Sequence, residues 1–336
     1  MNNKKILMDI SWSNMGGIGR FTDEISKLLT GISCAKIYKK CASPFAPLGL
    51  AVNILFQGKV DLILLPGYIP PLFCSKKFIV TIHDLNHLDL NDNSSFFKKL
   101  FYKFIIKRGC HQAYKIFTVS NFSKERIAKW SGVEPDKIVT VYNGVSDEFN
   151  IDVQPMDLGY EYLLCVGNRK THKNESRILS AFSKAEIDPS IKLVFSGNPS
   201  SDLEKLIVQY GISDRVNFLG FVSESNLPSL YKGSLGLVFP SLYEGFGLPV
   251  VEAMACGVPV LTSTTSSLPE VAGEAAILVD PVSVCAISDG ITKLVNDTKL
   301  REHLVHEGLL RAKKFSWKNV VNEIEMVLTE ACNETK

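Results

Sequence analysis

The segment from Leu235 to Leu261 constrains the fold of this 336-residue chain more than any other. It begins with an apolar run typical of a buried strand, passes through a turn that contains Gly245 and Gly247, and ends in a second apolar run. Pro249 suits the first turn of a helix, and Gly257 suits its left-handed C-terminal cap. The segment therefore predicts a strand–helix–strand unit with parallel strands.

Strand-like and helix-like stretches alternate along the whole sequence, as in parallel sheets with crossover helices. The expected strands are 5–10, 61–65, 78–82, 115–119 and 138–141, then 162–166, 192–195, 216–219, 235–239, 258–261 and 276–279. The polar segment 147–161 separates the two sets and suits a linker. We predict an α/β protein in which two doubly wound parallel-sheet domains face each other across a cleft, with ligands at the carboxyl ends of the strands.

Charge is unevenly distributed between the two halves. Residues 1–150 carry 20 Lys and Arg against 12 Asp and Glu, a net of +8, whereas residues 151–336 carry 17 against 23, a net of −6. A basic N-terminal half indicates an anionic partner, either nucleic acid or an acidic membrane surface. The sequence contains no helix-turn-helix, zinc or RNA-binding motif, so we expect no nucleic-acid partner.

The cysteines and the apolar runs indicate the compartment. The eight cysteines show no Cys-x-x-Cys pair and no metal-ligand spacing, and several lie in apolar runs, as small core residues do in a reducing compartment. The first apolar stretch is too short for a signal peptide, and no run of 18 apolar residues occurs. A cytoplasmic protein without a membrane-spanning segment or a bound metal ion is expected.

Glu244 and Glu252 lie eight positions apart, on either side of the glycine turn. A helix that begins after glycines presents free backbone N–H groups, which suit a phosphate. Carboxylates accept hydrogen bonds from sugar hydroxyls. Two solvated glutamates are the alternative, but the glycine and proline positions between apolar strands favour a site for a nucleotide sugar.

A basic loop, Gly167-Asn-Arg169-Lys170-Thr-His172-Lys173-Asn, follows the expected strand at 162–166. Cations this close repel one another unless an anion neutralises them. The loop is therefore either a solvated basic loop or a clamp for a diphosphate, which would stabilise the leaving nucleotide as charge develops on it.

Two features of the N-terminal half also lie at expected strand ends. Gly16 and Gly17 open a helix expected at 18–29, where they serve as a simple turn or let the backbone approach a phosphate or sugar. Their spacing does not fit a dinucleotide fingerprint. His83 ends the strand at 78–82, either as a structural residue or as a partner for a sugar hydroxyl or a phosphate.

Residues 95–108 form a helix-length stretch in which five cations alternate with aromatic and aliphatic side chains. Its apolar residues at helical spacing are Phe97, Leu100, Phe101, Phe104 and Ile105. One interpretation is a core helix with a basic outer face. The other is an interfacial helix, residues 96–108, that binds the anionic inner surface of the cell membrane.

The motifs Pro-Ser-x-Tyr-Glu244-Gly-Phe-Gly-Leu-Pro and Glu252-Ala-Met-Ala-x-Gly-x-Pro-Val resemble the signature of the retaining glycosyltransferases of family 4, also called group 1. The likeness runs from Gly16-Gly17 to Phe315-Ser-Trp317. It implies the GT-B fold, with an acceptor domain at 1–150, a donor domain at 151–314, and a final helix at 315–336 that crosses back to the first domain.

The resemblance also implies roles for single residues. Glu252 holds the ribose hydroxyls, Glu244 positions the sugar, and Arg169 and Lys173 contact the phosphates, with Lys170 as a substitute for Arg169. The expected catalytic residues are Glu244, His83, Arg169 and Lys173. The expected donor-binding residues are Gly16, Gly17, Arg169, Lys173, Gly220, Phe221, Val222, Glu244, Gly245, Phe246, Gly247, Leu248 and Glu252.

The implied reaction transfers a hexose, with mannose favoured, from a nucleotide-diphosphate sugar to a lipid-linked saccharide in O-antigen or capsule synthesis. The donor is a co-substrate, and neither a cofactor nor a metal is expected, because no Asp-x-Asp motif occurs and cations can carry the diphosphate. An acceptor on a lipid implies a cytoplasmic protein peripherally associated with the inner face of the membrane. A nucleotide-sugar epimerase of the same architecture and a non-catalytic partner subunit remain alternatives; the former needs differently placed carboxylates, and the latter typically lacks the glutamate pair or the basic loop.

Overall fold

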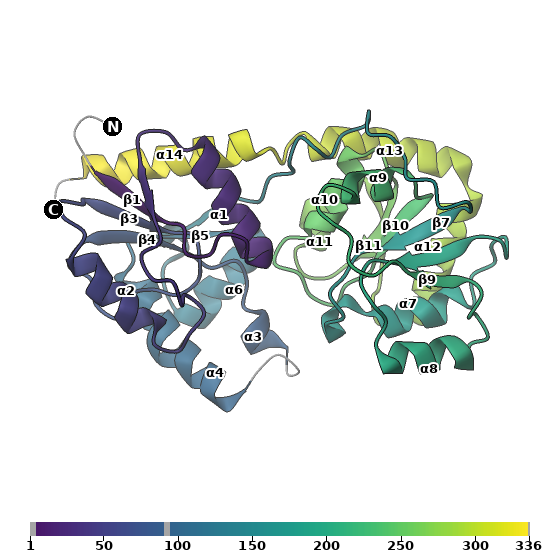
Figure 1. Ribbon diagram of the computed structural model, residues 1–336, viewed down its shortest axis with the longest axis horizontal. Helices are drawn as coiled ribbons and strands as arrows, with labels where there is room; N and C mark the ends of the chain where they lie inside the picture. The colour runs from purple at the N-terminus through teal and green to yellow at the C-terminus, as the bar shows by residue number, and fades with distance from the viewer. Residues whose placement is uncertain (1–4, 91–94, 335–336) are drawn as a thin grey trace. The chain divides into compact units, whose positions relative to one another are not determined.

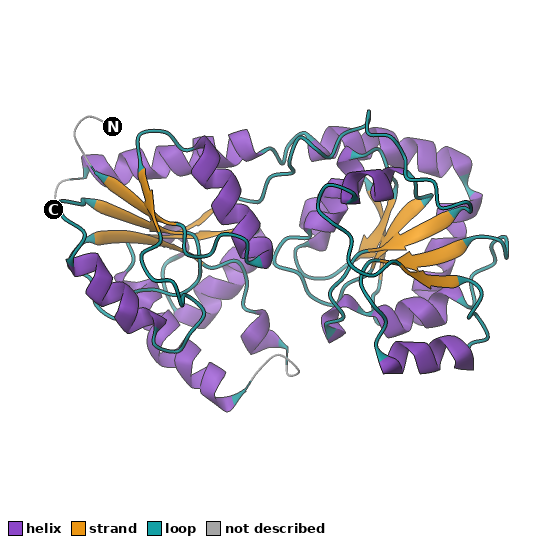
Figure 2. Ribbon diagram, viewed as in Figure 1, coloured by secondary structure: helices purple, strands orange, loops and turns teal. Residues whose placement is uncertain are grey.

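The computed structural model describes residues 5–90 and 95–334. The chain divides into two compact units (Figure 1). Unit 1 contains the residues up to Gly144 and those from Trp317 onward, and unit 2 contains Val145–Ser316. Each unit is built on a six-stranded sheet in which every pairing is parallel, with helices on both faces (Figure 2). The predicted α/β fold with two parallel sheets is confirmed.

The sheet of unit 1 has the strand order β2-β1-β3-β4-β5-β6. Its strands are β1 (Ile6–Asp9), β2 (Ser33–Ala35), β3 (Leu62–Leu65), β4 (Lys77–Thr81), β5 (Lys115–Thr118) and β6 (Ile138–Thr140). Its helices are α1 (Gly16–Leu28), α2 (Ala46–Leu55), α3 (Asn86–Asp89), α4 (Phe96–Phe101), a π-helical stretch (Tyr102–Ile106), α5 (Lys107–Gln112), α6 (Asn121–Ser131), a 3₁₀ turn (Pro135–Lys137) and α14 (Trp317–Asn333).

The strands of unit 1 are buried on both faces, as parallel strands usually are. Ile6 packs with Phe21 of α1 and Ile324 of α14 on one face. Leu7 belongs to the cluster on the other face, which contains Leu50 of α2 together with residues from α5 and the π-helical stretch. Side-chain alternation along each strand therefore supplies two separate layers of core.

Helix α14 directly follows unit 2 in the sequence but packs in unit 1. Its N-terminal Trp317 contacts Phe21 at 6.0 Å between ring centroids. At its other end, Lys77 Nζ donates to the carbonyl oxygens of Ala331 at 3.0 Å and Glu334 at 2.7 Å. A cation that bonds the last carbonyls satisfies groups that a helix leaves open and complements its dipole.

The sheet of unit 2 has the strand order β12-β11-β10-β7-β8-β9. Its strands are β7 (Tyr162–Cys165), β8 (Lys192–Phe195), β9 (Val216–Phe218), β10 (Gly236–Phe239), β11 (Val260–Ser263) and β12 (Ala276–Val279). Its helices are a 3₁₀ turn (Thr171–Lys173), α7 (Glu175–Phe182), α8 (Ser201–Gln209), α9 (Leu227–Lys232), α10 (Leu248–Ala255), α11 (Leu268–Ala272), α12 (Val284–Asn296) and α13 (Thr298–Ala312).

The strand order of unit 2 reverses direction at β7. The chain proceeds from β7 outward through β8 and β9, and then returns to β10 on the other side of β7. In open parallel sheets, ligands bind at such a switch point, beyond the carboxyl ends of the two central strands. The basic loop after β7 and the Glu244 loop after β10 therefore lie next to each other.

Every strand expected from the sequence is present, with ends shifted by at most two residues, but β2 was not predicted. This edge strand is only three residues long and partly exposed, so it lacks the apolar run that marks the other strands. The expected linker 147–161 belongs to unit 2, where Phe149 is buried and Met156 N donates to Ser229 O at 2.8 Å.

The core-helix interpretation of residues 95–108 is wrong about which side chains are buried. The buried side chains of this stretch are Tyr102 and Ile106, whereas Phe97 and Phe104 are exposed. The turns between Tyr102 and Ile106 are π-helical, which places more residues in each turn than the α-helical spacing assumes. Among the described residues, no helix combines the length and apolarity that crossing a bilayer requires.

Candidate functional site

The N-terminus of α10 depends on a glycine conformation. Gly247 precedes the helix with φ +111°, and a Cβ there would lie 2.6 Å from Leu268 Cδ2. Pro249 occupies the first turn, and Gly257 follows the helix with φ +69°, as the sequence predicted. Pro249 has no N–H group and Val250 N donates to Gly247 O at 3.0 Å, so the start of α10 presents the positive end of the helix dipole at the carboxyl end of the sheet.

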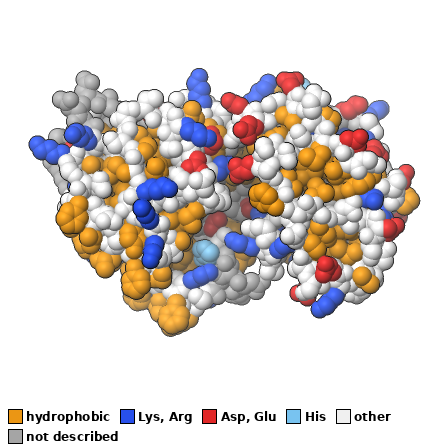
Figure 3. All heavy atoms as spheres, in the orientation of Figure 1, with side chains coloured by type: hydrophobic (Ala, Val, Ile, Leu, Met, Phe, Trp, Pro, Cys, Tyr) orange, Lys and Arg blue, Asp and Glu red, His pale blue; other side chains and the backbone are white. Residues whose placement is uncertain are grey.

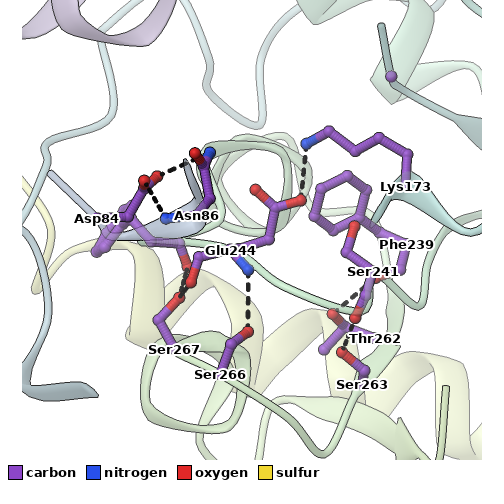
Figure 4. Close-up of polar contacts among 12 residues, drawn as sticks. Asp84, Asn86, Lys173, Phe239, Ser241, Glu244, Thr262, Ser263, Ser266 and Ser267 are labelled. Atoms are coloured by element: carbon purple, nitrogen blue, oxygen red, sulfur yellow. Dashed lines mark hydrogen bonds and ion pairs between the residues drawn. The ribbon is translucent and has the colours of Figure 1, made fainter. Parts of the chain in front are cut away.

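The loop that carries Glu244 is held by the serines that follow β11 (Figure 4). Glu244 N donates to Ser266 Oγ at 3.1 Å. The buried hydroxyl of Ser267 lies 2.9 Å from Glu244 O and 2.8 Å from Phe246 O. These bonds fix the backbone of the loop and therefore the position of the Glu244 Cα atom, from which the carboxylate extends.

Lys173 and Glu244 meet directly. Lys173 Nζ lies 2.7 Å from Glu244 Oε1, and both side chains are largely buried, at 14% and 13% exposed. The ammonium group also lies 4.9 Å from the centroid of the Phe239 ring, at the end of β10 (Figure 4). The structure thus places a cation and a carboxylate from two loops, both predicted as site residues, in one contact.

Asn174 connects the loops after three strands. It has a left-handed backbone, with φ +64°. Its Nδ2 donates to Pro240 O at 2.9 Å and to Pro281 O at 2.6 Å, and its Oδ1 accepts from Arg177 at 2.9 Å. Sequence reasoning missed this residue, although an Asn between a 3₁₀ turn and a helix is suited to this conformation. It holds the loop that carries Lys173.

Arg169 points to Glu175 in the structure. Its guanidinium donates to Glu175 Oε1 at 2.5 Å and also bonds Ser196 O. The group lies 5.3 Å from the Phe195 ring centroid and 5.5 Å from that of Phe218. Burial raises the pKa of Glu175, and the nearby Arg169 opposes that rise. Arg169 therefore stabilises the loop, and its contact with a phosphate stays a prediction.

Glu252 is buried in α10 with a polar partner. Its Oε2 accepts a hydrogen bond from Tyr231 OH at 2.9 Å, and the residue is only 3% exposed. A carboxylate this buried needs hydrogen-bond partners. Tyr231, which lies on α9 and was not singled out in the sequence, orients Glu252.

The loop with the expected donor-binding residues Gly220, Phe221 and Val222, which the family resemblance implies for the nucleobase, follows β9. Gly197 N donates to Gly220 O at 2.6 Å, which couples the loops after β8 and β9. Phe221 is 90% exposed, so its ring is accessible to a ligand at this end of unit 2.

In unit 1, the glycine turn begins α1. The helix starts at Gly16 and not at Ile18 as predicted. Gly16 has φ +59°, and a Cβ at Gly16 or Gly17 would meet no atom within 4 Å. The backbone at this turn is therefore accessible.

His83 follows β4 and is held in one tautomer. Its Nε2 lies 2.9 Å from Pro66 O. A carbonyl oxygen only accepts, so Nε2 carries the proton and Nδ1 is an acceptor. Burial lowers the pKa of His83 to about 4. The imidazole is therefore neutral near pH 7, which suits a sugar hydroxyl better than a phosphate.

Two family models match the chain. The model of group 1 glycosyl transferases matches residues 146–311, and the model of glycosyltransferase family 4 matches residues 15–149.

Curated relatives and solved structures agree with these models. The chain is 31% identical to the O-antigen chain mannosyltransferase B of Escherichia coli, over 74% of this chain and 69% of that protein. It is also 31% identical to the O-antigen chain mannosyltransferase RfbU of Salmonella typhimurium, over 69% of this chain and 64% of that protein.

Two solved structures show the fold. A glycosyltransferase from Rickettsia africae has a TM-score of 0.75 at 18% identity, covering 100% of both chains. WaaG, a glycosyltransferase involved in lipopolysaccharide biosynthesis, has a TM-score of 0.75 at 14% identity, covering 97% of this chain and 99% of that chain. The chain thus belongs to the group 1 glycosyltransferases of family 4 and has their GT-B fold.

Proposed function

We propose that this chain transfers a hexose, with mannose favoured, from a nucleotide-diphosphate sugar to a lipid-linked oligosaccharide in O-antigen or capsule synthesis. The observation that carries the proposal is the Lys173–Glu244 contact beside the N-terminus of α10. The preference for mannose rests on similarity to the O-antigen mannosyltransferases of E. coli and Salmonella.

The donor would bind through charge and hydrogen bonds. The diphosphate would be attracted to Lys173 Nζ and to the positive end of the α10 dipole. Glu244 then accepts from hydroxyls of the sugar, and Glu252 accepts from the ribose. Because Lys173 and the helix dipole would offset the diphosphate charge, transfer is expected to persist in a metal chelator.

The reaction would proceed with retention. The bond between the anomeric carbon and the leaving phosphate oxygen breaks, and the acceptor oxygen bonds to the same face. The acceptor proton passes to the leaving phosphate. Lys173 would stabilise the negative charge that develops on that phosphate. Such electrostatic stabilisation of the transition state is usually the largest single contribution to catalysis.

A lipid-linked acceptor would bring unit 1 to the cytoplasmic surface of the membrane. Phe96, Phe97 and Phe104 are 71%, 81% and 60% exposed, and lysines lie between them. Residues 95–124 contain no Asp or Glu. Exposed aromatic rings among cations suit an anionic lipid surface.

The first experiment is a thermal-shift screen against GDP, UDP, dTDP and CDP and their sugars. A ligand at 100 times its Kd stabilises the native state by about 2.7 kcal/mol. We expect a shift with one nucleotide, loss of that shift in Glu252→Ala, and an unchanged shift in Glu302→Gln, an exposed control on α13. No shift with any nucleotide would contradict the donor site.

The second experiment measures transfer from the donor that binds to lipid-linked saccharides, followed by NMR of the product. An α-linked product from an α-linked donor supports retention, whereas a β-linked product contradicts it. Interconversion of the donor sugar without an acceptor would favour the epimerase alternative.

A further inference from the structure

Helix α2 exposes an apolar face that neither the predicted donor site nor the predicted membrane helix uses. Its inward side chains, including Leu50 and Ile54, are buried in the core of unit 1. On its outward side Leu48, Val52 and Leu55 are 47%, 39% and 57% exposed. The flanking rings are more exposed still, Phe45 at 73% and Phe56 at 82%.

A helix that is apolar on all sides is normally covered on all sides. Within α2, the one strongly polar side chain is Asn53, and its Nδ2 donates to Ile37 O at 2.8 Å. Gly49 lies against Tyr38, where a Cβ would come within 2.3 Å of the ring. The inward side of the helix is therefore packed against unit 1. The outward side carries apolar side chains and no strongly polar one.

The α2 face and the α4 region belong to one side of unit 1. Both pack in the same core cluster on one face of the sheet. The segment between β3 and β4 connects them, because Leu72 N donates to Pro47 O at 2.8 Å and Pro70 approaches Gly109 of α5 so closely that a Cβ there would clash. Phe73, in the same segment, is 41% exposed. Figure 3 shows hydrophobic side chains gathered where Figure 1 places α2 and α4.

The positive charge of the segments that flank α2 indicates which kind of partner its apolar face fits. From residue 25 to residue 60 the sequence contains five lysines and no Asp or Glu. Lys36, Lys39, Lys40 and Lys59 are exposed on the segments that flank the helix. A second copy of this face would bring the same cations against them, which disfavours self-association. An apolar face on a chain segment, 25–60, that carries five lysines and no Asp or Glu fits an anionic lipid surface.

We propose that the outward face of α2 inserts into an anionic bilayer and acts with the α4 region as a two-part membrane anchor. The inference rests on the membrane association proposed above. Two anchoring elements in one compact unit also fix its orientation on the membrane, which a single short helix does not.

The test compares three triple variants in flotation with vesicles of phosphatidylethanolamine, with and without phosphatidylglycerol. The α2 variant is Phe45→Gln/Leu55→Gln/Phe56→Gln. The α4 variant is Phe96→Gln/Phe97→Gln/Phe104→Gln. The control, Val208→Gln/Val282→Gln/Met326→Gln, removes side chains that are 71%, 60% and 65% exposed elsewhere. Thermal melting checks that each variant is folded.

We expect the wild type and the control to bind only the anionic vesicles, and each anchor variant to bind them at least about tenfold more weakly. If the α4 variant loses binding and the α2 variant does not, the inference about α2 is wrong while membrane association stands. If the wild type does not bind at all, both fail.

A second readout does not depend on loss of binding. Phe56→Trp should give a blue-shifted emission with anionic vesicles and be quenched by brominated lipid acyl chains. Absence of quenching in bound protein would overturn the inference. A wild-type dimer in sedimentation velocity that the α2 variant converts to monomer would also overturn it, in favour of a second copy of the chain.

Discussion

Lys173 and Arg169 show how neighbouring cations of one loop acquire different roles. Lys173 faces Glu244, on the loop that precedes α10. Arg169 donates hydrogen bonds to the Glu175 carboxylate and to the carbonyl oxygen of Ser196. Both were predicted as phosphate ligands, and the structure makes Lys173 the one that lies beside the Glu244 loop.

Lys173→Met should lower kcat/KM by about 100- to 1000-fold, because a charge that stabilises the leaving phosphate is lost. It should also lower the melting temperature, since the largely buried Glu244 loses its partner. The double variant Lys173→Met/Glu244→Gln should recover the melting temperature but not the activity. Recovery of both in steady-state assays would show that the pair is only structural.

His83 should make stability depend on pH. Its native pKa of about 4 lies below the ordinary value of 6.5, so the unfolded chain takes up the proton first as the pH falls. The stabilisation is complete above pH 6.5 and is lost as the pH falls towards 4, by at most about 3 kcal/mol.

His83→Gln should remove this part of the pH dependence while an amide still donates to Pro66 O. Urea unfolding of both proteins between pH 7.5 and 4.5 measures the difference. Parallel curves for the wild type and the variant would contradict the assignment of a neutral His83 with a lowered pKa.

Among the secondary-structure elements, the strands with apolar runs were predicted well, whereas at 95–108 the helix is present but the face that it buries was not predicted. A strand buried on both faces is recognisable from four consecutive apolar residues, as in β3 and β10. The face that a helix buries depends on its exact turn, and the π-helical stretch Tyr102–Ile106 changes that turn. No local signal in the sequence reveals the change.

Gly247→Ala should disturb the start of α10. The substitution combines a positive φ with a Cβ only 2.6 Å from Leu268, so unfolding free energy should fall by more than the roughly 1 kcal/mol that a left-handed alanine costs. Gly211→Ala is the matched control, because Gly211 has φ +66° and open space around a Cβ. Equal losses in chemical denaturation would show that the clash relaxes at no cost.

For the chain as a whole, α14 couples the end of the sequence to the first unit. Side chains of this helix, among them Val320, Ile324 and Leu328, are buried in the core with Phe21 and Ile25. Each such side chain contributes about 1.5–3 kcal/mol by burial, and several together approach the 5–15 kcal/mol that stabilises a typical domain.

Truncation after Ser316 should therefore unfold unit 1 and leave unit 2 folded. Hydrogen exchange should show loss of protection in β1, β3 and α1, with protection retained in β7 and β10 as the internal control. Retained protection in β1 and β3 would show that unit 1 does not need α14.

Local patterns account for the elements and for much of the candidate site. The apolar strands, the glycine turn before α10 and the basic loop after β7 are contiguous in sequence, so propensity and periodicity reveal them. The motif around Glu244 and Glu252 was also sufficient to identify the family, because its residues lie within one strand–turn–helix unit.

The partners of these residues come from elsewhere in the chain. Lys173 meets Glu244 across 71 residues, and Tyr231 reaches Glu252 from another helix. His83 acquires its low pKa from the burial around it. Such contacts depend on strand order and on which helices cover each face, so they arise only when the sheets assemble and the loops at their carboxyl ends come together.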